Sequence, residues 1–451
     1  MLQMGCIDER TIAKYKQEAK DKGRDSWWLA YVMDVGEEEK AKGKTVEVGR
    51  ATFSTETKQF TVFDAPGHKN YVPNMIMGAA LADYGGLVIS ARKGEYEAGF
   101  EKDGQTREHV QLAKSLGVQK LVIVVNKMDD SSVKWSETRW NEIKNNLTPF
   151  LVNSGYAMED FQFVPISGLT GENLKEPVEK DVCPWYDGPT LIQALDKLPV
   201  EPRNPTGPVR IPILDKMREQ GVIAHGKIES GTIKVGDKIM VLPSGLPSQV
   251  GSILDHKNSP VMFARPGENV QIRLIHIEDE NMINKGDVIV NREQPLPVTM
   301  LFEAELDLLE LIEYKPILSR GYQCIIHCHT IAEDCIVKDI IEATEKMPSG
   351  EFKTTQAPKF VRSFAKMIVR IQTKNPVCLE KYSILPQLGR FTLRDEGRTI
   401  AVGRVTKYKP HKVEASIVVS GAGAIKTAAQ AQEEMKQGDK NAPLVFDMES
   451  G

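Results

Sequence analysis

The sequence predicts a multidomain protein in which one α/β domain is followed by two all-β domains. The chain has 451 residues, which is too many for one ordinary hydrophobic core. Up to about residue 200, short apolar runs alternate with helical patterns, as expected for a parallel sheet covered by helices on both faces. From residue 209 onward the strands are short and the turns frequent, which is typical of β-barrels or sandwiches.

The elements of the α/β domain follow from apolar periodicity. Residues 8–22 are rich in Lys, Glu, Arg and Ala and predict an exposed helix, and the aromatic residues from 27 to 33 predict a packed cluster. Two β-rich runs come next, residues 45–54 and residues 60–64. Further helices are predicted over residues 72–81, 109–116 and 135–150 and after residue 189, with buried strands over residues 86–90, 121–125 and 161–167.

Two segments rich in proline mark the domain boundaries. Residues 202–208 predict a linker, and residues 294–297 predict a second boundary. We therefore expect domains over residues 1–203, 204–294 and 295–409. Residues 410–451, which contain a stretch rich in Gln, Lys and Glu, predict a flexible extension.

Composition narrows the class of protein. The chain is 41% hydrophobic and 27% charged, as in soluble globular proteins, and its net charge of −4 gives no global basic field toward nucleic acid. We expect no sequence-specific DNA binding. Apolar runs are too short to span a bilayer, and the N-terminus lacks the pattern of a signal peptide. The six cysteines are scattered, which suits a reducing compartment, so a cytoplasmic protein without a membrane partner is expected.

A first group of polar residues follows the strand predicted to end at Asp64. We expect this strand to be a buried parallel one, whose carboxyl edge is where open α/β sheets bind ligands. Asp64 could hold Mg²⁺, because hard cations take oxygen ligands. The backbone N–H of Gly67 could approach a terminal phosphate, and His68 could orient a water molecule. The alternative is an ordinary Pro-Gly turn after a strand.

A second motif, Asn126-Lys127-Met128-Asp129, follows another predicted strand. The carboxylate of Asp129 can accept the two N–H donors on the Watson–Crick edge of guanine, which adenine does not present. Asn126 can bridge the base and neighbouring loops, and the stem of Lys127 can lie over the purine ring. A polar turn is the alternative here.

A third motif, Ser167-Gly168-Leu169, carries weight only in combination. Its backbone could complete a base pocket. All three motifs end a predicted strand and occur in a fixed order, which makes a chance match improbable.

In combination the three motifs resemble those of the translational GTPases. A GTPase domain before two β-barrels is similar to the elongation factor 1 alpha branch. The segments 43–50 and 389–395 resemble more closely the eukaryotic class II polypeptide chain release factors. The resemblance extends over roughly residues 7–409.

This resemblance implies a GTP-binding and GTP-hydrolysing factor that assists the stop-codon-reading class I release factor on the ribosome. It implies GTP or GDP and Mg²⁺ as ligands, with Thr45 and Asp64 on the metal, His68 ordering the attacking water and Asp129 reading guanine. It also implies that one segment of the last barrel docks the class I factor; this segment consists of Gly389, Arg390, Phe391, Thr392, Leu393, Arg394 and Asp395. From the residues alone, an edge strand with a charged turn is the alternative for that segment.

One departure concerns the phosphate loop of P-loop GTPases. The chain contains no Gly-x-x-x-x-Gly-Lys-[Ser/Thr] motif, since Glu38 stands where the first glycine would precede Gly43 and Lys44. The resemblance implies that the first strand and this loop would precede Met1. We therefore expect a P-loop-type domain without them, two strands lacking a pairing partner, and weak GTP binding by this chain alone.

Other functions stay open at this point. A ribosome-rescue or elongation-type GTPase fits the same motifs. A module that binds a partner without catalysis would fit the missing phosphate loop.

Five residues invite comparison with a zinc site. They are Cys324, His327, Cys328, His329 and Cys335. Their spacing fits no structural zinc pattern, and residues 323–330 predict a β-strand, in which alternate side chains point to opposite faces. A strand without a metal is the favoured interpretation.

Overall fold

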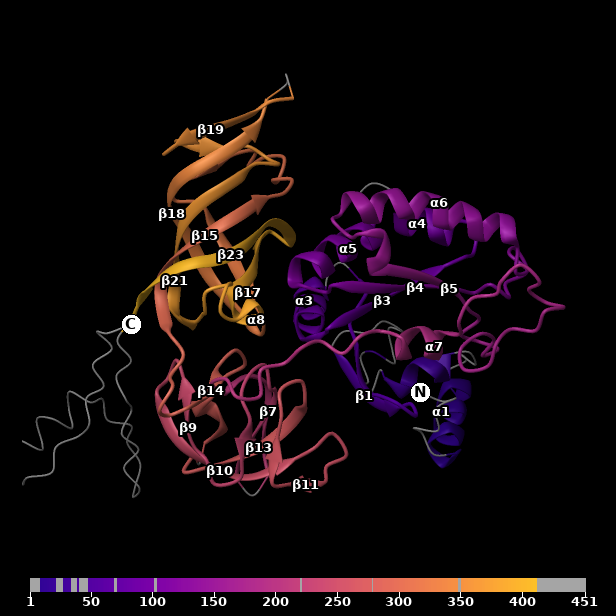
Figure 1. The fold of residues 1–451 in the computed structure, drawn as a ribbon, viewed down its shortest axis with the longest axis horizontal. Coiled ribbons are helices and arrows are strands. Elements are labelled where there is room, and N and C mark those ends of the chain that lie inside the picture. Colours follow the sequence, from indigo (N-terminus) through magenta and orange to yellow (C-terminus); the bar gives the residue numbers. More distant parts are fainter. Residues whose placement is uncertain are drawn as a thin grey trace, which may run out of the picture. The chain divides into compact units, whose positions relative to one another are not determined.

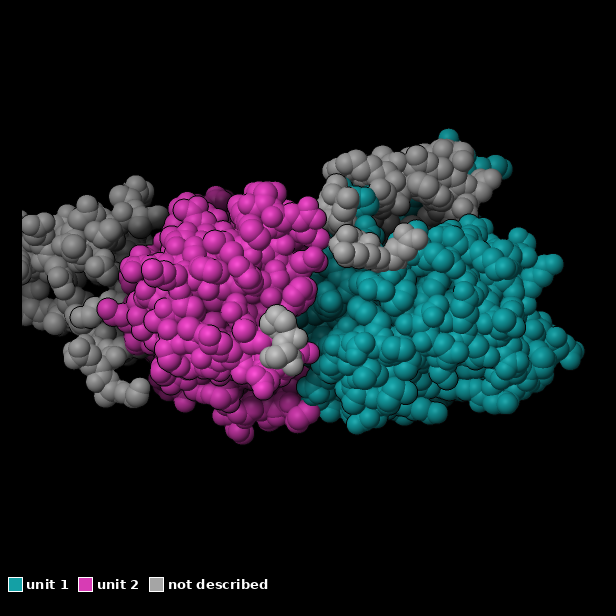
Figure 2. All heavy atoms as spheres, turned by 90° about the horizontal axis from the view of Figure 1, so that it is seen from above, with its two compact units in different colours: residues 1–201 teal, residues 202–451 magenta. Residues whose placement is uncertain are grey.

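A computed structural model describes residues 9–21, 27–33, 39, 48–68, 71–100, 104–219, 221–277, 279–347 and 350–411. The chain divides into two compact units, residues 1–201 and residues 202–451 (Figure 2). Thr45 and nearly all of the predicted extension lie outside the described residues.

The first unit contains a three-stranded parallel sheet in the order β3-β4-β5. Its strands are β3 (Tyr84–Ser90), β4 (Lys120–Asn126) and β5 (Phe161–Pro165), and its helices include α4 (Glu95–Phe100), α5 (Gln105–Leu116), α6 (Glu137–Asn153) and α7 (Leu191–Asp196). The 3₁₀ turn η4 (Met158–Asp160) precedes β5.

Side chains of β4 alternate between two hydrophobic clusters. Leu121, Ile123 and Val125 join a cluster that contains residues of α4, α5 and α6, whereas Val122 and Val124 pack with α7. Figure 1 shows α4 and α6 on one side of the sheet and α7 on the other. The sheet therefore has helices on both faces, as predicted from the alternation of strands and helices.

The strand that ends at Asp64 differs from the prediction. β2 (Gln59–Asp64) pairs antiparallel with β1 (Gly49–Ser54), and the two form a separate ladder. Most of β2 is half-buried rather than buried. The expectation of a buried parallel strand was therefore wrong, because a strand is enclosed only when neighbours cover both of its edges, and β2 has one paired neighbour among the described strands.

Helices attach this ladder to the rest of the unit. α3 (Val72–Leu81) packs against α5 through Val72, Met75 and Ile76, which contact leucines of α5. Toward the N-terminus, α1 (Glu9–Asp21) is mostly exposed, and η2 (Trp27–Val32) buries Tyr31 edge-on against Tyr15.

The second unit begins with a closed six-stranded barrel in the order β10-β13-β7-β6-β14-β9, in which β9 pairs back to β10. Its residues alternate between an aliphatic interior and the outer surface. The bounds are β6 (Arg210–Arg218), β7 (Val222–Lys227), β8 (Ile233–Lys234), β9 (Lys238–Leu242), β10 (Leu246–Leu254), β11 (Pro260–Val261), β12 (Phe263–Ala264), β13 (Asn269–Ile275), η5 (Glu280–Met282) and β14 (Val288–Asn291).

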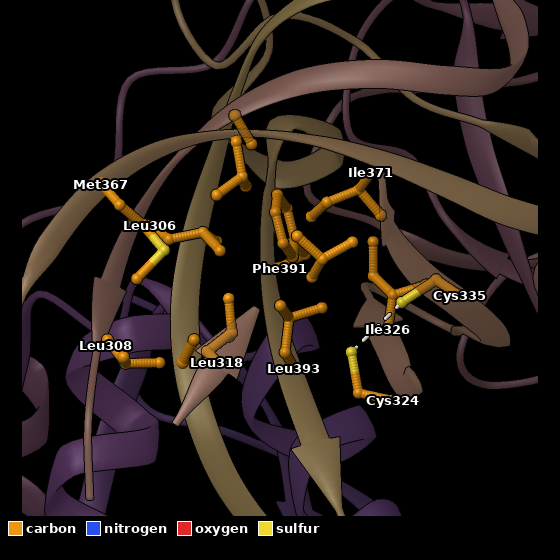
Figure 3. Close-up of a cluster of buried hydrophobic side chains, with 14 of the residues drawn as sticks. Leu306, Leu308, Leu318, Cys324, Ile326, Cys335, Met367, Ile371, Phe391 and Leu393 are labelled. Carbon is orange, nitrogen blue, oxygen red and sulfur yellow. Dashed lines mark hydrogen bonds between the residues drawn. The ribbon is translucent and has the colours of Figure 1, made fainter. Parts of the chain in front are cut away.

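A second closed barrel follows in the order β17-β22-β23-β15-β21-β18, closed by pairing of β17 with β18. Phe302 and Phe391 meet edge to face in its core, with ring centroids 5.6 Å apart. Figure 3 shows aliphatic side chains around Phe391. The bounds are β15 (Val298–Leu308), β16 (Leu318–Ser319), β17 (Gln323–Cys328), β18 (Ile331–Lys346), β19 (Phe352–Gln356), β20 (Phe360–Val361), β21 (Lys366–Cys378), α8 (Pro386–Gly389), β22 (Arg390–Asp395) and β23 (Arg398–Pro410).

Buried contacts join the two barrels. An apolar cluster contains Leu242 and Val288 of the first barrel together with Cys378 and Leu388 of the second. Glu229 of the first barrel, whose side chain is fully buried, lies 3.1 Å from Nε2 of His329 in the second. Burial alone would raise the pKa of Glu229, but the neighbouring Lys227, His329 and Arg203 outweigh it and lower that pKa.

Candidate functional site

The loops that follow β4 and β5 are tied together by one side chain. Oδ1 of Asn126 accepts the backbone N–H of Lys127 at 2.7 Å and the backbone N–H of Gly168 at 2.8 Å. The predicted bridging role of Asn126 between neighbouring loops corresponds to these two hydrogen bonds. The two ends of adjacent parallel strands thus form one polar edge.

Gly168 fits this edge because it has no side chain. A Cβ atom at this position would lie 3.2 Å from Oδ1 of Asn126, closer than ordinary van der Waals contact. Ser167 is fully buried and its Oγ accepts the N–H of Thr170, whereas Leu169 is 69% exposed. Gly168, between the buried serine and the exposed leucine, is itself exposed.

Lys127 takes a backbone conformation that is uncommon for a residue with a side chain. Its φ is +63°, in the left-handed region. Its Nζ atom lies 2.7 Å from Oε2 of Glu95, in the first turn of α4. The hydrogen bond from Lys127 is the largest cause that lowers the pKa of Glu95 to about 2. Glu95 was missed by sequence reasoning, because nothing in the local pattern links residues 32 positions apart.

Two acids stand next to each other in this loop and have different surroundings. Asp130 accepts hydrogen bonds from the hydroxyl and N–H of Ser132 and lies 2.7 Å from the guanidinium of Arg92, and these contacts lower its pKa to about 2, those of Ser132 most of all. Asp129 is half-buried at the start of the turn. The contacts with Ser132 and Arg92 thus hold Asp130 in place. Asp129 is the acid that the sequence motif predicts to bind the ligand.

The second group of predicted site residues lies beyond β2. Asp64 is the last residue of the strand and pairs with Gly49. His68 is half-buried, its carbonyl accepts the N–H of Tyr71 at 2.9 Å, and its ring centroid lies 5.9 Å from that of Tyr71. Gly67 is exposed.

His109 of α5 was not predicted as a site residue, but it lies beside Gly67. A Cβ atom at position 67 would be 4.0 Å from Cε1 of His109. Burial lowers the pKa of His109, which favours a neutral imidazole at neutral pH. A pattern search could not find it, because His109 sits in an ordinary amphipathic helix.

The structure brings the predicted residues together in two groups. Hydrogen bonds join Asn126, Lys127 and Gly168 directly. Asp64, Gly67 and His68 form the other group, and packing of β2 on α3, α3 on α5 and α5 on β3 connects it to the parallel sheet.

The segment from Gly389 to Asp395 forms the end of α8 and all of β22. This strand pairs with β17 on one side and with β23 on the other, so the edge-strand alternative was wrong. Six of the seven residues are buried, and Arg390 is the half-buried one. The Nε of Arg390 donates to the carbonyl of Pro386, and its guanidinium lies over the ring of Tyr382.

No cluster of three or more potential metal ligands occurs among the described residues. The strand predicted over residues 323–330 corresponds to β17, in which Cys324 faces Cys335 across the ladder. Of the two predicted metal ligands, Asp64 lies in the described part of the chain and Thr45 lies outside it. In that same part, no helix is long and apolar enough to cross a membrane.

Comparison with known proteins places each segment of the chain. Residues 2–201 match the family model of the elongation factor Tu GTP binding domain. Residues 221–290 match elongation factor Tu domain 2, and residues 302–406 match the GTP-eEF1A C-terminal domain-like family.

Relatives agree with these matches. The chain is 46% identical, over 89% of its length, to a eukaryotic peptide chain release factor GTP-binding subunit from Candida albicans, of which it covers 56%. The chain thus spans about half the length of the curated relatives it matches. A solved structure of Sup35 complexed with GDP is 35% identical over 90% of this chain and 89% of that one, with a TM-score of 0.43.

The Ski7 GTPase-like domain of S. cerevisiae, solved bound to GDP and inorganic phosphate, shares the fold. It aligns over 90% of this chain and 92% of that one, with 18% identity and a TM-score of 0.73.

Proposed function

Because the chain belongs to the translational GTPases, we propose that it acts in translation termination. Within this family it resembles the GTP-binding subunit of the eukaryotic release factor. The proposed role is to bind and hydrolyse GTP while assisting the class I release factor on the ribosome. The observation that carries the proposal is the pair of hydrogen bonds that Oδ1 of Asn126 accepts from the N–H groups of Lys127 and Gly168, which joins the two loops into one polar edge.

Guanine recognition is assigned to the residues of this edge. Asp129 would accept the N1–H and the N2 amino group of guanine, and the stem of Lys127 would cover the ring. Ser167, Gly168 and Leu169 would supply backbone contacts to the base. The close approach at Gly168 supports this assignment, because any side chain there would displace Asn126.

Hydrolysis is assigned to the residues beyond β2. Asp64, with Thr45, would hold Mg²⁺, which when bound neutralises phosphate charge. The backbone N–H of Gly67 would face the terminal phosphate. His68 would orient the attacking water, because its ring is anchored beside Tyr71 and lies in the segment that follows the acid.

Docking of the class I factor is assigned to the segment from Gly389 to Asp395. Because Phe391, Thr392 and Leu393 are fully buried, they would act by fixing the shape of β22. Arg390, stacked near Tyr382 with Arg404 over the same ring, offers the accessible charge. Domain limits at residues 203, 294 and 409 complete the proposal.

The proposed guanine site is tested by a substitution of Asp129, the residue proposed to recognise the base. Asp129→Asn replaces a carboxylate oxygen by an N–H donor, so the site should lose GDP and gain XDP, whose base carries a carbonyl where guanine carries its amino group. The expected exchange of preference is about tenfold or more, since each mismatched polar contact costs about 1–3 kcal/mol. Calorimetric titration of both proteins with GDP, XDP and ADP measures it, and Asp130→Asn is the neighbouring control.

Equal binding of GDP and ADP by the unmodified chain would contradict the assignment of Asp129. GTP affinity of this chain alone is expected to be weak, as argued from its sequence, and tight binding would overturn that expectation. Phosphate release in the presence of ribosomes then separates a GTPase from a module without catalysis. Capture by a stop-codon-reading factor, compared with a rescue factor and aminoacyl-tRNA, separates termination from the related functions.

A further inference from the structure

Two cysteines of the second barrel lie side by side in adjacent strands. Cys324 of β17 and Cys335 of β18 are directly opposite in the ladder, and their Sγ atoms are 3.5 Å apart (Figure 3). Five cysteines are described, all as free thiols, and this is the pair for which sulfur–sulfur contact is recorded.

The backbone at this pair suits a covalent bond. Opposite residues of antiparallel strands have Cα atoms about 4.5 or 5.5 Å apart, and disulfides span Cα separations of about 4.4–6.8 Å. The sulfur atoms would have to approach from 3.5 Å to about 2 Å. Rotation of the two side chains provides this movement without changing the register of the ladder.

A cavity lies beside the pair, whose side chains are buried, with Cys324 7% and Cys335 6% exposed. It measures about 560 Å³ and is lined by both cysteines, by Asp334, and by Gln372, Thr373 and Lys374 of β21. The cavity lies where two strands of the barrel separate, because the ladder between β18 and β21 ends at the pair Cys335 and Thr373.

Beyond that point, side chains rather than backbone bridge the two strands. Nδ2 of Asn375 donates to Oε1 of Glu333 at 3.0 Å, and Nζ of Lys374 lies 3.6 Å from Oδ2 of Asp334. Both side chains of the Lys374 pair are about 70% exposed. Exposed side-chain bridges of this kind contribute little stability, so no backbone ladder has to break for β18 and β21 to separate next to the two thiols.

We propose that Cys324 and Cys335 form a reversible thiol–disulfide site whose oxidant is a small disulfide. The thiolate of one cysteine attacks a sulfur of the small disulfide, which forms a mixed disulfide and releases one small thiol. The second cysteine then attacks the protein sulfur of the mixed disulfide and displaces the other small thiol. The two protons of the cysteines end on the two released thiols, and the protein loses two electrons.

The disulfide would form reversibly and would contribute little to the stability of the fold. Its two cysteines are 11 positions apart in one hairpin, so the folded ladder already closes this short loop. A crosslink that closes a short loop adds less stability than one that closes a long loop. The disulfide should therefore be reduced again by an excess of small thiol.

The rate of oxidation of the two cysteines should increase with pH. The contact with Cys335 and burial together raise the pKa of Cys324, which keeps the thiolate rare at neutral pH. Exchange requires the thiolate, so oxidation should accelerate about tenfold for each unit of pH between about 7 and 9.

Peptide mapping of the oxidised full-length chain tests the proposal. The folded chain is incubated with oxidised glutathione, denatured and alkylated, and then digested with trypsin. One tryptic peptide, residues 321–338, contains Cys324, Cys328 and Cys335. We expect alkylation of Cys324 and Cys335 to fall about tenfold or more, that of Cys328 to be unchanged, and reduction to restore all three.

Matched variants locate the bond. Cys328→Ser should leave the oxidation unchanged, because the thiol of Cys328 faces the carbonyl of Leu388 instead. Cys335→Ser should leave Cys324 with at most a mixed disulfide to glutathione. Full alkylation of both cysteines after oxidation of the unmodified folded chain would overturn the proposal. So would formation of the same pair at the same rate in urea, since the fold would then contribute nothing.

Discussion

At the scale of single residues, the loops after β4 and β5 show how much one side chain can organise. Asn126 accepts two backbone N–H groups from different loops, and Lys127 holds a left-handed backbone while its amine reaches Glu95. The motif from Asn126 to Asp129 was recognisable in the sequence because it is local. Its partner Glu95 and the nearby His109 were not, because contacts across the sheet edge depend on how α4 and α5 pack.

At the same scale, ionisation of the buried carboxyl of Asp287 should lower the stability of the folded chain. Its side chain is buried next to the N–H of Asn284, and desolvation raises its pKa to about 6. Because the folded chain holds this proton more tightly than the unfolded chain does, the group favours the folded state below about pH 4, and that contribution is lost as the pH rises through about 6.

Asp287→Asn should therefore increase the free energy of unfolding at pH 7, by up to about 3 kcal/mol, and should change it little at pH 4. Its amide oxygen can still accept the N–H of Asn284. Denaturant unfolding at the two pH values measures the difference. Asp215→Asn is the control, since the side chain of Asp215 is 66% exposed in the same barrel, and an equal gain in both variants would contradict the argument.

At the scale of elements, apolar periodicity predicted most of the α/β domain. The helix over residues 72–81 has the expected bounds, and the strand expected over residues 121–125 forms the core of β4. The direction and burial of β2 were not predictable from its own residues. Both properties depend on which strands lie beside it, and the sequence of a strand carries little information about its neighbours.

β22 shows the same limit in the second barrel. Its charged ends suggested an edge strand, yet Phe391 and Leu393 are fully buried and the strand is paired on both sides. Thr392 and Arg394, which alternate with these two apolar residues, are buried as well, so polar character in the sequence did not mark exposure here.

Phe391→Ala should accordingly cost about 3–5 kcal/mol of stability, because it removes a fully buried ring that packs on Phe302. Phe352→Ala is the matched control, since Phe352 of β19 is 71% exposed and should change stability by less than about 0.5 kcal/mol. Urea unfolding followed by far-UV circular dichroism compares the two. Similar losses in both variants would show that burial does not decide the cost.

At the scale of the whole molecule, the turn-rich pattern after residue 209 predicted two β domains, and the family models match each of them. Closure of each sheet into a six-stranded barrel was not evident from the pattern alone. It depends on pairings between strands that are far apart in the sequence, such as β6 with β14 and β15 with β23.

The two barrels should unfold as one cooperative unit. They share an apolar cluster and the fully buried pair of Glu229 and His329, so separating them would expose an apolar surface and a buried charge. We expect a fragment of residues 202–411 to show a single calorimetric transition with equal calorimetric and van't Hoff enthalpies. Two resolved transitions would show that the contact between the barrels is weak.

The edge of β3 that is unpaired among the described strands should promote association between molecules in concentrated solution. This strand pairs with β4 on one side and with no other strand in the described part of the chain, and Val88 in its middle is 62% exposed. Unpaired backbone beside an apolar side chain is a template for sheet growth between molecules. Val88→Lys should slow the rise of light scattering with protein concentration, whereas the same change at the isolated exposed Val200 should not. The edge strand of the parallel sheet is therefore the place where we expect association between molecules to begin.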